Sequence, residues 1–366
     1  MNVTIPRSAL IDLAKHAAHI APNASPSKII THLRLVARDN RVTVTATDYA
    51  LTYEGSRAAT VAAPGSVCIN ARVLRDCAGM LHDGPVRVTR EGKRSSVTLA
   101  TGKRSYTLPV LDGEDYPGIQ HAAGVAADVD SGALGGTLRR TAHAQGALAH
   151  KPDFAGARLT VRGREVRAEA TDGVRLAQSA RDGATGGDAA VLVPSVYVAQ
   201  LAAALEHVAR VKVTVGDERV TVDAGEDRWT TRTFTGRVPP DLDGFVPPFR
   251  CTVDVDRAEL VGSLDAASVA SPDSDRVTFG CDPDERRLRI LAETASDRAV
   301  YDELDAVYTG ESPPERWNGQ RSHLLAALRG LDCDRVEIRM SEGTTPLTII
   351  DPTDARYRTV IAPMGV

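Results

Sequence analysis

The sequence predicts an α+β protein built from three tandem copies of one domain, each with two helices on curved antiparallel sheets. Apolar landmarks recur at intervals of about 124 residues, which indicates a long internal repeat. The recurring residues are Val42, Val166 and Ile290 in a predicted strand, and Leu81, Leu205 and Leu328 in a predicted helix. One interval shared by strand and helix positions in three places favours duplicated domains over coincidence.

The first copy begins with a short strand that leads into a helix over Arg7–Ile20. Leu10, Leu13 and Ala17 fall on one face of that helix. Strand pairs with alternating residues follow, as in "RVTVTATD". A second helix is predicted over Asn70–Asp83, with Asn70 as its N-cap.

The other two copies repeat this order, and Pro- and Gly-rich stretches near Tyr116–Gly124 and Val238–Pro248 separate them. The predicted domains are therefore residues 1–121, 122–248 and 249–366. Pro194 suits the first turn of a helix. The four further helices are predicted over Ser131–His150, Pro194–Arg210, Asp256–Ser271 and Trp317–Gly330.

Composition narrows the class of protein. No apolar run approaches the roughly 18 residues that a bilayer span needs, and the N-terminus lacks an apolar signal core. The five cysteines form no C-x-x-C pair, which is typical of free thiols in a reducing compartment. We therefore expect a cytoplasmic protein without a membrane partner.

Four motifs, in order along the chain, resemble one known family. They are "TATDYALTYEG", "YTLPVLDGEDYP" (Tyr106–Pro117), "ATDGVRL" (Ala170–Leu176) and the tail "TVIAPMGV" (Thr359–Val366). Together, and within a threefold repeat, they resemble the bacterial beta sliding clamp, the beta subunit of DNA polymerase III. The resemblance covers essentially the whole chain.

This resemblance implies a fold of three DNA-clamp domains per chain and a homodimer that closes into a six-domain ring. Such a ring encircles double-stranded DNA without reading its sequence and tethers the replicative polymerase as a processivity factor in DNA replication. It has no catalytic residue and no cofactor, and any 3′–5′ exonuclease activity belongs to the holoenzyme. The implied partners are the polymerase III alpha subunit, the clamp loader and other proteins with clamp-binding peptide motifs.

A sliding ring needs basic helices that face the DNA. The net charge of the chain is −4, but the six predicted helices carry a small positive excess. The residues that we expect to face phosphates are Lys15, Arg72, Arg75, Arg139, Arg140 and Arg321. Because the excess is small, a repeat scaffold that binds short peptide motifs but not DNA stays open as an alternative.

The resemblance also implies a hydrophobic cleft that takes short peptides. Its residues here would be Phe154, Thr171, Gly173, Arg175, Leu176, Pro240, Phe245, Val360, Ile361, Pro363 and Met364. The chain departs from the family pattern at Val174, Ala362 and Gly365 and in "GRVPPDLDGF". These changes indicate a specialised or accessory clamp, either plasmid- or phage-borne or altered to evade a cleft-binding antibiotic, or else a divergent lineage.

The dimer contact implied by the resemblance pairs Tyr106 and Leu108 with Ser268 and Val269. Ser268 is more polar than the family pattern leads us to expect, which would loosen the ring.

Catalytic and metal sites are not predicted. Asp48 and Asp172 lie in different copies, so they cannot act on one substrate, and each is expected to cap a turn through nearby backbone N–H groups. His16 and His19 have no third metal ligand nearby in the sequence.

Overall fold

The computed structural model describes residues 1–92, 94–146, 154–195, 197, 198, 201, 205, 208–233, 242–270, 272–293 and 299–365. The chain forms two compact units. The first comprises Met1–Ala126 and Arg210–Thr233, and the second comprises Ala127–Ala209 and Phe234–Val366. Each is described by itself below.

The first unit contains a continuous antiparallel sheet with the strand order β16-β17-β18-β4-β3-β2-β6-β9-β8-β7-β1-β5. Its strands are β1 (Asn2–Pro6), β2 (His32–Arg38), β3 (Arg41–Thr47), β4 (Leu51–Ala58), β5 (Thr60–Ala63), β6 (Gly65–Asn70), β7 (Pro85–Thr89), β8 (Ser96–Thr101), β9 (Arg104–Asp112), β16 (Arg210–Val215), β17 (Arg219–Ala224) and β18 (Asp227–Arg232). Alternating residues of these strands are buried, as the period of a half-buried strand requires.

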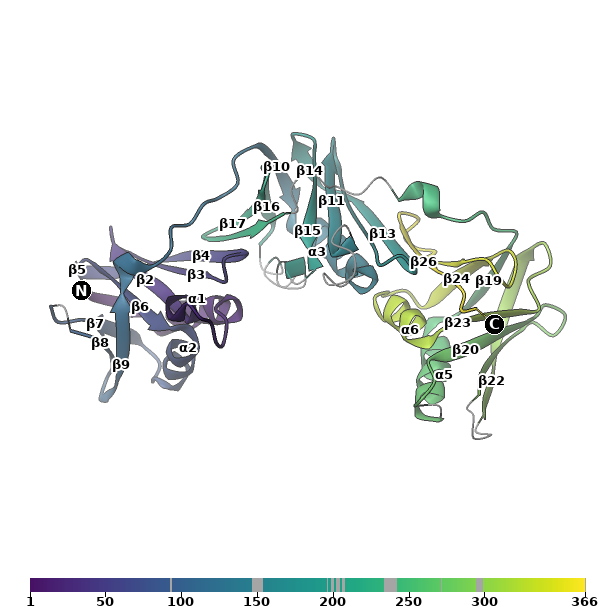
Figure 1. The fold of residues 1–366 in the computed structure, drawn as a ribbon, viewed down its shortest axis with the longest axis horizontal. Helices are drawn as coiled ribbons and strands as arrows, with labels where there is room; N and C mark the ends of the chain where they lie inside the picture. The colour runs from purple at the N-terminus through teal and green to yellow at the C-terminus, as the bar shows by residue number, and fades with distance from the viewer. Residues whose placement is uncertain are drawn as a thin grey trace. The chain divides into compact units, whose positions relative to one another are not determined.

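Two helices, α1 (Arg7–Ile20) and α2 (Ala71–Met80), pack beside each other in the first unit (Figure 1). Leu10, Leu13 and Ala17 of α1 are fully buried, which confirms the predicted apolar face. The Asn70 side chain accepts a hydrogen bond from the backbone N–H of Val73, so the predicted N-cap is also confirmed.

The second unit contains a twelve-stranded antiparallel sheet with the order β15-β11-β12-β13-β26-β25-β24-β19-β22-β21-β20-β23, and most of the antiparallel pair β10 and β14. Its strands are β10 (Val125–Asp130), β11 (Gly156–Arg162), β12 (Glu165–Thr171), β13 (Arg175–Asp182), β14 (Ala184–Gly186), β15 (Ala189–Pro194), β19 (Cys251–Asp256), β20 (Arg276–Asp282), β21 (Arg287–Glu293), β22 (Ala299–Gly310), β23 (Arg316–Gln320), β24 (Arg335–Met340), β25 (Leu347–Ile350) and β26 (Tyr357–Ile361). The sheet therefore joins strands from the second and third predicted domains.

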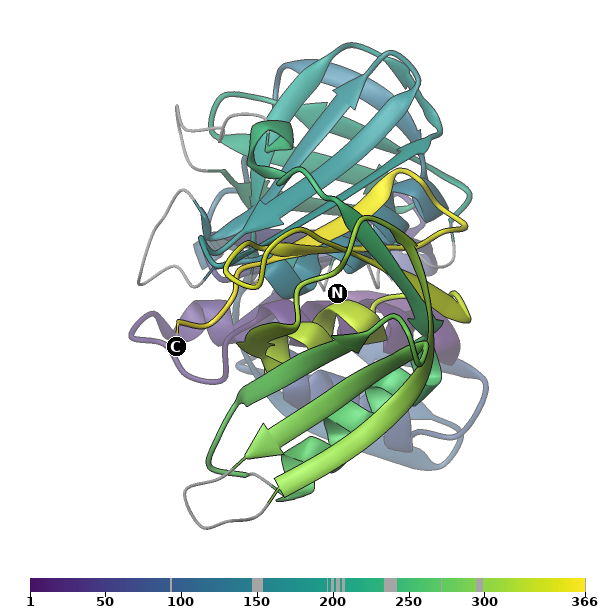
Figure 2. The same ribbon diagram turned by 90° about the vertical axis from the view of Figure 1, so that its right-hand side faces the viewer.

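The described helices of the second unit are α3 (Ser131–Thr141), α5 (Arg257–Ala270) and α6 (Arg321–Arg329), and α5 lies across β21 and β22 (Figure 2). Short 3₁₀ turns occupy Lys28–Thr31, Gly113–Asp115, Ala142–Ala144 and Asp243–Phe245. The prediction that a helix starts at Trp317 is wrong. Residues Trp317–Gln320 end strand β23, where the indole of Trp317 is fully buried against Phe279.

The predicted α+β class is confirmed. Pro194 is the last residue of β15, and most of the helix predicted after it lies outside the described residues. Within the described part of the chain, no helix has both the length and the apolar character that crossing a membrane requires.

Candidate functional site

The repeated Thr-Asp motif forms the same tight turn in both copies. In the second copy, the Asp172 carboxylate accepts the backbone N–H groups of Val174 and Arg175, both at 2.9 Å. The Thr171 hydroxyl donates to the Arg175 carbonyl and accepts the N–H of Gly173, whose φ is 92°. This confirms that the aspartate caps a turn.

The first copy repeats this bonding. Asp48 accepts the N–H groups of Ala50 and Leu51, and Thr47 bonds the Leu51 carbonyl and the Tyr49 N–H. Tyr49 has a φ of 73°, a conformation that glycine adopts at less cost. The backbone of this turn is therefore strained at Tyr49. Each turn ends a strand and starts the next, β3 to β4 and β12 to β13.

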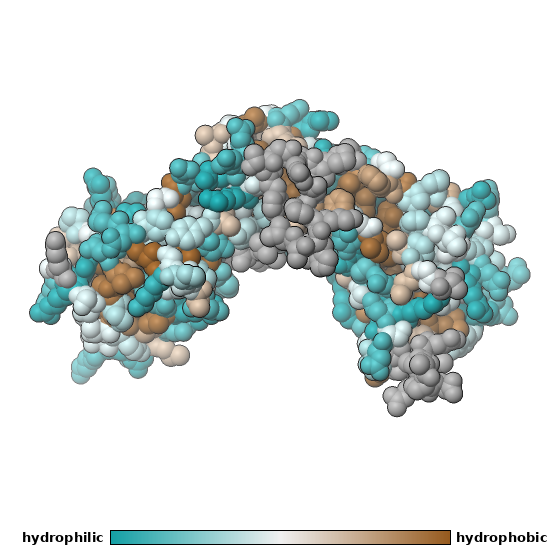
Figure 3. All heavy atoms as spheres, in the orientation of Figure 1, coloured by the Kyte–Doolittle hydropathy of each residue, from teal (hydrophilic) through white to brown (hydrophobic). Residues whose placement is uncertain are grey.

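A mostly apolar cavity of about 380 Å³ lies beside the second of these turns. Leu176 on β13 and Val360 on β26 are partners across the two strands and form its floor with Leu242. In Figure 3 apolar side chains gather at the position that β26 occupies in Figure 1. A cavity of this size with an apolar floor suits a few side chains of a peptide.

Most of the predicted cleft residues line this cavity: Phe154, Thr171, Gly173, Arg175, Leu176, Phe245 and Val360. Phe245 is 65% exposed, so a large aromatic face is open to a ligand. Ile361 is fully buried and points away from the cavity wall, and Pro363 and Met364 do not line it. Pro240 lies outside the described residues.

Four further residues line the cavity: Val174, Leu242, Pro346 and Ala362. Val174 and Ala362 are two of the positions where the chain departs from the family pattern, so the sequence contained a signal for them. Pro346 immediately precedes β25, and no local feature of the sequence connects it to β13.

The chain end is fixed by its backbone at the rim of the cavity. The N–H of Ala362 donates to the Val174 carbonyl and the N–H of Met364 donates to the Asn318 carbonyl, both at 2.9 Å. The tail thus extends the pairing of β26 with β13 by one residue and then turns towards β23. Its side chains are partly exposed, which leaves them available at the edge of the cavity.

The charged groups near the cavity are engaged with each other. Arg175 donates to Asp172 at 2.9 Å. Burial opposes the charge on Asp172, but hydrogen bonds from the turn N–H groups and from Arg175 outweigh it and lower the pKa of the carboxyl. Burial, with the nearby Arg175, lowers the pKa of His143 to about 4, so this imidazole is neutral at pH 7. The Asp172–Arg175 pair therefore holds the turn beside the cavity.

The predicted DNA-facing cations fall into two groups. Lys15, Arg72 and Arg139 are exposed, and Arg75 is partly exposed and paired with Asp76 at 2.8 Å. Arg140 and Arg321 require a correction, because each is only 8% exposed.

Arg140 bonds Asp354 at 2.6 Å and Asp351 at 3.3 Å and lies over the ring of Tyr357. Arg321 donates to the Ala267 carbonyl at 3.1 Å. Guanidinium groups held in this way cannot reach a phosphate. We therefore no longer expect Arg140 or Arg321 to contact DNA.

The predicted dimer residues lie on two elements. Tyr106 is half-buried and Leu108 is buried on β9, whereas Val269 on α5 is 82% exposed. The Ser268 hydroxyl is turned back to the Asp265 carbonyl of its own helix. Val269 is therefore the residue of this set with the largest free apolar surface.

His16 does have acidic neighbours that the sequence did not reveal. Asp12 and Asp227 come within 4.8 Å of its ring nitrogen, which is a spacing that could hold a metal ion. Arg57, however, already bonds both Asp227, at 2.7 Å, and Asp12. The guanidinium supplies the positive charge that a metal ion would supply, so we read this cluster as a structural ion-pair network.

Comparison with known proteins decides the family. Residues 1–120 match the model of the DNA polymerase III beta subunit, N-terminal domain, and residues 128–240 match that of its central domain. The chain belongs to the bacterial beta sliding clamp family. Its function is therefore that of a processivity factor of DNA polymerase III in DNA replication, and it is not an enzyme.

Individual relatives are distant but match over their full length. The chain is 23% identical to the beta sliding clamps of Streptomyces coelicolor and Caulobacter vibrioides, and the matches cover 100% of this chain and 99% and 100% of those proteins. Its fold is similar to a sliding clamp from Bacillus subtilis, with a TM-score of 0.92, 21% identity and coverage of 100% of this chain and 99% of that one. A DnaN sliding clamp from Pseudomonas aeruginosa bound to griselimycin is similar with a TM-score of 0.92, 22% identity and full coverage of both chains.

Proposed function

We propose that the chain works as a cytoplasmic homodimer that encircles double-stranded DNA and holds its partners through the apolar cleft. In this proposal each chain consists of three clamp domains, residues 1–121, 122–248 and 249–366. The partners are the polymerase III alpha subunit, the clamp loader and other proteins with clamp-binding peptides.

The observation that carries the homodimer is a strand junction that occurs twice in the chain. After the first Thr-Asp turn, β4 pairs with β18, with Thr52 opposite Thr230. After the second, β13 pairs with β26, with Leu176 opposite Val360. In both junctions the strand after the turn pairs with the last strand of the next copy.

Two strands lack the partner that this junction would give them: the last strand of the first copy, and the strand of the third copy that is equivalent to β4 and β13. In the first copy the last strand is β9, and its residues 104–109 are bonded on one side only, to β8, among the described residues. In the third copy the equivalent of β4 and β13 is β22, and its described residues 301–305 are bonded only to β21. A second chain would supply the missing partner at both edges. A closed dimer leaves neither edge unpaired, whereas a single chain leaves both exposed.

A charge on the exposed apolar surface near this edge should open the dimer. We expect Val269→Asp to raise the dimer dissociation constant at least tenfold, because a carboxylate would then have to be desolvated at the interface. Sedimentation velocity over a dilution series measures this. Val125→Asp, at a 43% exposed valine outside the predicted interface, is the control and should leave the constant unchanged.

The exposed cations should contribute weak phosphate contacts. We expect Lys15→Gln combined with Arg72→Gln to weaken DNA binding and to reduce the slope of log K against log salt by about 0.9 per lost phosphate contact. DNA-binding titrations at several salt concentrations measure the slope. An unchanged slope would exclude these side chains from the DNA-facing surface.

Retention on circular but not on linear DNA tests whether the protein encircles DNA. A clamp loaded by a bacterial clamp loader and ATP should stay on nicked circular DNA in high salt during gel filtration and should run off when the circle is cut. Loss from both forms, with peptide binding intact, would favour the peptide-binding scaffold that does not encircle DNA.

The altered cleft suggests a specialised or accessory clamp as an extension of this proposal. Val174 and Ala362, where the family pattern has His and Met, both line the cavity. A standard clamp-binding peptide should then bind more weakly than to an ordinary clamp, as should griselimycin, to which the similar Pseudomonas aeruginosa clamp is bound. Equal affinities would support a divergent lineage with an ordinary role.

A further inference from the structure

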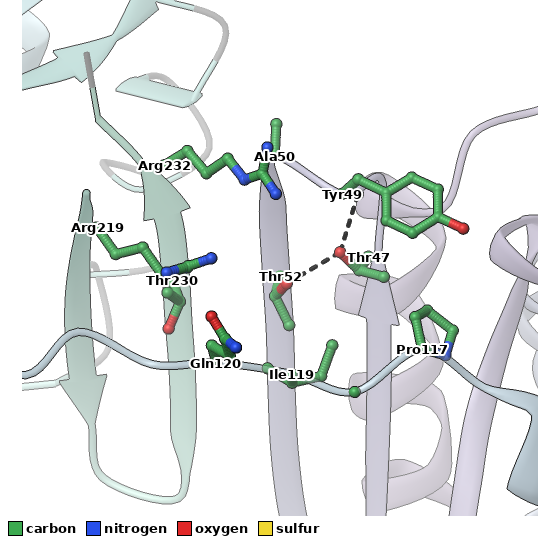
Figure 4. Close-up of a pocket in the computed structure, with 11 residues that line it drawn as sticks. Thr47, Tyr49, Ala50, Thr52, Pro117, Ile119, Gln120, Arg219, Thr230 and Arg232 are labelled. Carbon is green, nitrogen blue, oxygen red and sulfur yellow. Dashed lines mark hydrogen bonds between the residues drawn. The ribbon is translucent and has the colours of Figure 1, made fainter. Parts of the chain in front are cut away.

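A second pocket, of about 230 Å³, lies in the first unit beside the Thr47–Leu51 turn (Figure 4). Thr47 and Thr52 lie on one side of it, and Arg219, Thr230 and Arg232 come from β17 and β18. The linker after β9 closes it, and the Gln120 side chain points towards Thr230 in Figure 4.

This pocket lies at the junction of β4 with β18, in the same position that the apolar cleft has at the junction of β13 with β26. Thr52 faces Thr230 across β4 and β18, as Leu176 faces Val360 across β13 and β26. Both pockets begin at the same hydrogen-bonded Thr-Asp turn and are covered by the linker between two copies. They are equivalent sites of a duplicated fold.

The chemistry of the equivalent positions is reversed. Arg219 and Arg232 lie two residues beyond the Thr221–Thr230 pair of β17 and β18. Pro346 and Ala362 lie two residues beyond the Thr348–Val360 pair of β25 and β26. The cleft therefore has proline and alanine where this pocket has two arginines, and leucine and valine where it has two threonines.

The two arginines form a pair of like charges that described acidic residues compensate only weakly. Arg219 and Arg232 are direct partners across β17 and β18, a position in which like charges destabilise a sheet. Arg232 makes no ion pair with any residue that the structure describes, and Arg219 reaches only the exposed Glu218, at 3.7 Å. A bound anion would relieve this repulsion.

The threonine hydroxyls do not serve as the main donors. Thr52 donates to Thr47 at 2.9 Å, and Thr47 donates to the Leu51 carbonyl. The Thr230 hydroxyl is within 3.0 Å of both the His121 ring nitrogen and the Thr221 hydroxyl. The guanidinium groups are therefore the strong donors left to a ligand, and guanidinium pairs best with a carboxylate or a phosphate.

We infer that this pocket is a second peptide site, which binds acidic side chains of a partner protein. The two arginines of the pocket favour a ligand with carboxylate or phosphate oxygens. That this ligand is a peptide rests on the function proposed for the equivalent cleft. Two neighbouring carboxylates would match the two arginines, and the small pocket limits the contact to a few residues.

The probe is an acetylated and amidated peptide Ala-Asp-Asp-Ala-Ala with a neutral dye, followed by fluorescence anisotropy at low salt. We expect saturable binding to the full chain, and at least tenfold weaker binding of the Asn-Asn peptide. Arg219→Gln with Arg232→Gln should weaken binding of the acidic peptide at least tenfold. The control, Arg87→Gln with Lys212→Gln, removes two exposed charges outside the pocket from the same unit and should change it less than twofold.

A clamp-binding peptide for the apolar cleft is titrated in parallel. Its unchanged binding to the Arg219/Arg232 variant shows that the variant is folded and keeps the two proposals separate. Acidic-peptide binding that survives the double substitution, or no binding while the cleft peptide binds, would overturn the inference. Displacement by inorganic phosphate at concentrations equal to that of the unlabelled peptide would also overturn it, because the pocket would then be a simple anion site.

Discussion

Replacing Arg140 with methionine is expected to destabilise the second unit by about 3 kcal/mol. Asp351 is 1% exposed and Arg140 is 8% exposed, so the substitution leaves a buried carboxylate without its cation. The loss of the contact with the Tyr357 ring adds a smaller cost. Urea unfolding can be followed by Trp317 alone in a Trp229→Phe background, since the chain has two tryptophans.

Two controls separate the buried charge from a general effect. Arg329 pairs with Asp265 at 2.6 Å with both side chains largely exposed, so Arg329→Met should cost less than about 1 kcal/mol. Adding Asp351→Asn to Arg140→Met should recover part of the loss, because the unpaired charge is then removed. Equal losses for Arg140→Met and Arg329→Met would contradict the account.

The same pair predicts a pH dependence. Burial raises the pKa of Asp351, but hydrogen bonds from Thr353 and the charge of Arg140 outweigh it, so the pKa lies below its ordinary value. A lowered carboxyl pKa stabilises the fold above the ordinary value of about 3.9 and loses this effect as the pH falls through the lowered value. Without Arg140 the decline should begin at higher pH, which unfolding titrations between pH 3 and 7 would detect.

Replacing Phe245 with alanine is expected to weaken binding of a clamp-binding peptide at least tenfold and to leave stability nearly unchanged. The ring is 65% exposed and lines the apolar cavity, so it has much apolar area to offer a ligand and little role in the core. Aromatic residues, phenylalanine included, are enriched at protein interfaces relative to the rest of the surface. A tenfold loss corresponds to about 1.4 kcal/mol of binding free energy.

Phe249→Ala is the matched control, since this phenylalanine is 47% exposed and contacts Arg339 outside the cavity. Titration of a labelled peptide from a polymerase III alpha subunit compares the two variants. If both bind as well as the unaltered chain, the cavity is not the site where partner peptides bind.

Local features of the fold could be predicted from the sequence, because they depend on neighbouring residues. The helix over Arg7–Ile20 follows from its apolar spacing, the Asn70 cap from one side chain, and the turn at Asp172 from backbone N–H groups two and three residues ahead. Most of the cleft followed from the family resemblance, because its residues lie within recognisable motifs.

Features that depend on distant partners could not be predicted. Arg140 is buried against Asp351 and Asp354, which lie 211 and 214 residues away in the sequence. Pro346 reaches the cleft only through the pairing of β25 with β26. The helix expected from Trp317 begins only at Arg321. Residues 316–320 form a strand in which alternate residues, Trp317 and Gly319, are buried.

The most direct test of the central proposal is the mass of the chain in solution, measured by light scattering after size exclusion over a dilution series. The account predicts a dimer near twice 38.9 kDa that persists to low concentration, because β9 and β22 each lack a partner within one chain. A monomer at all concentrations, without DNA or loader, would contradict closure of the dimer by these two strand edges.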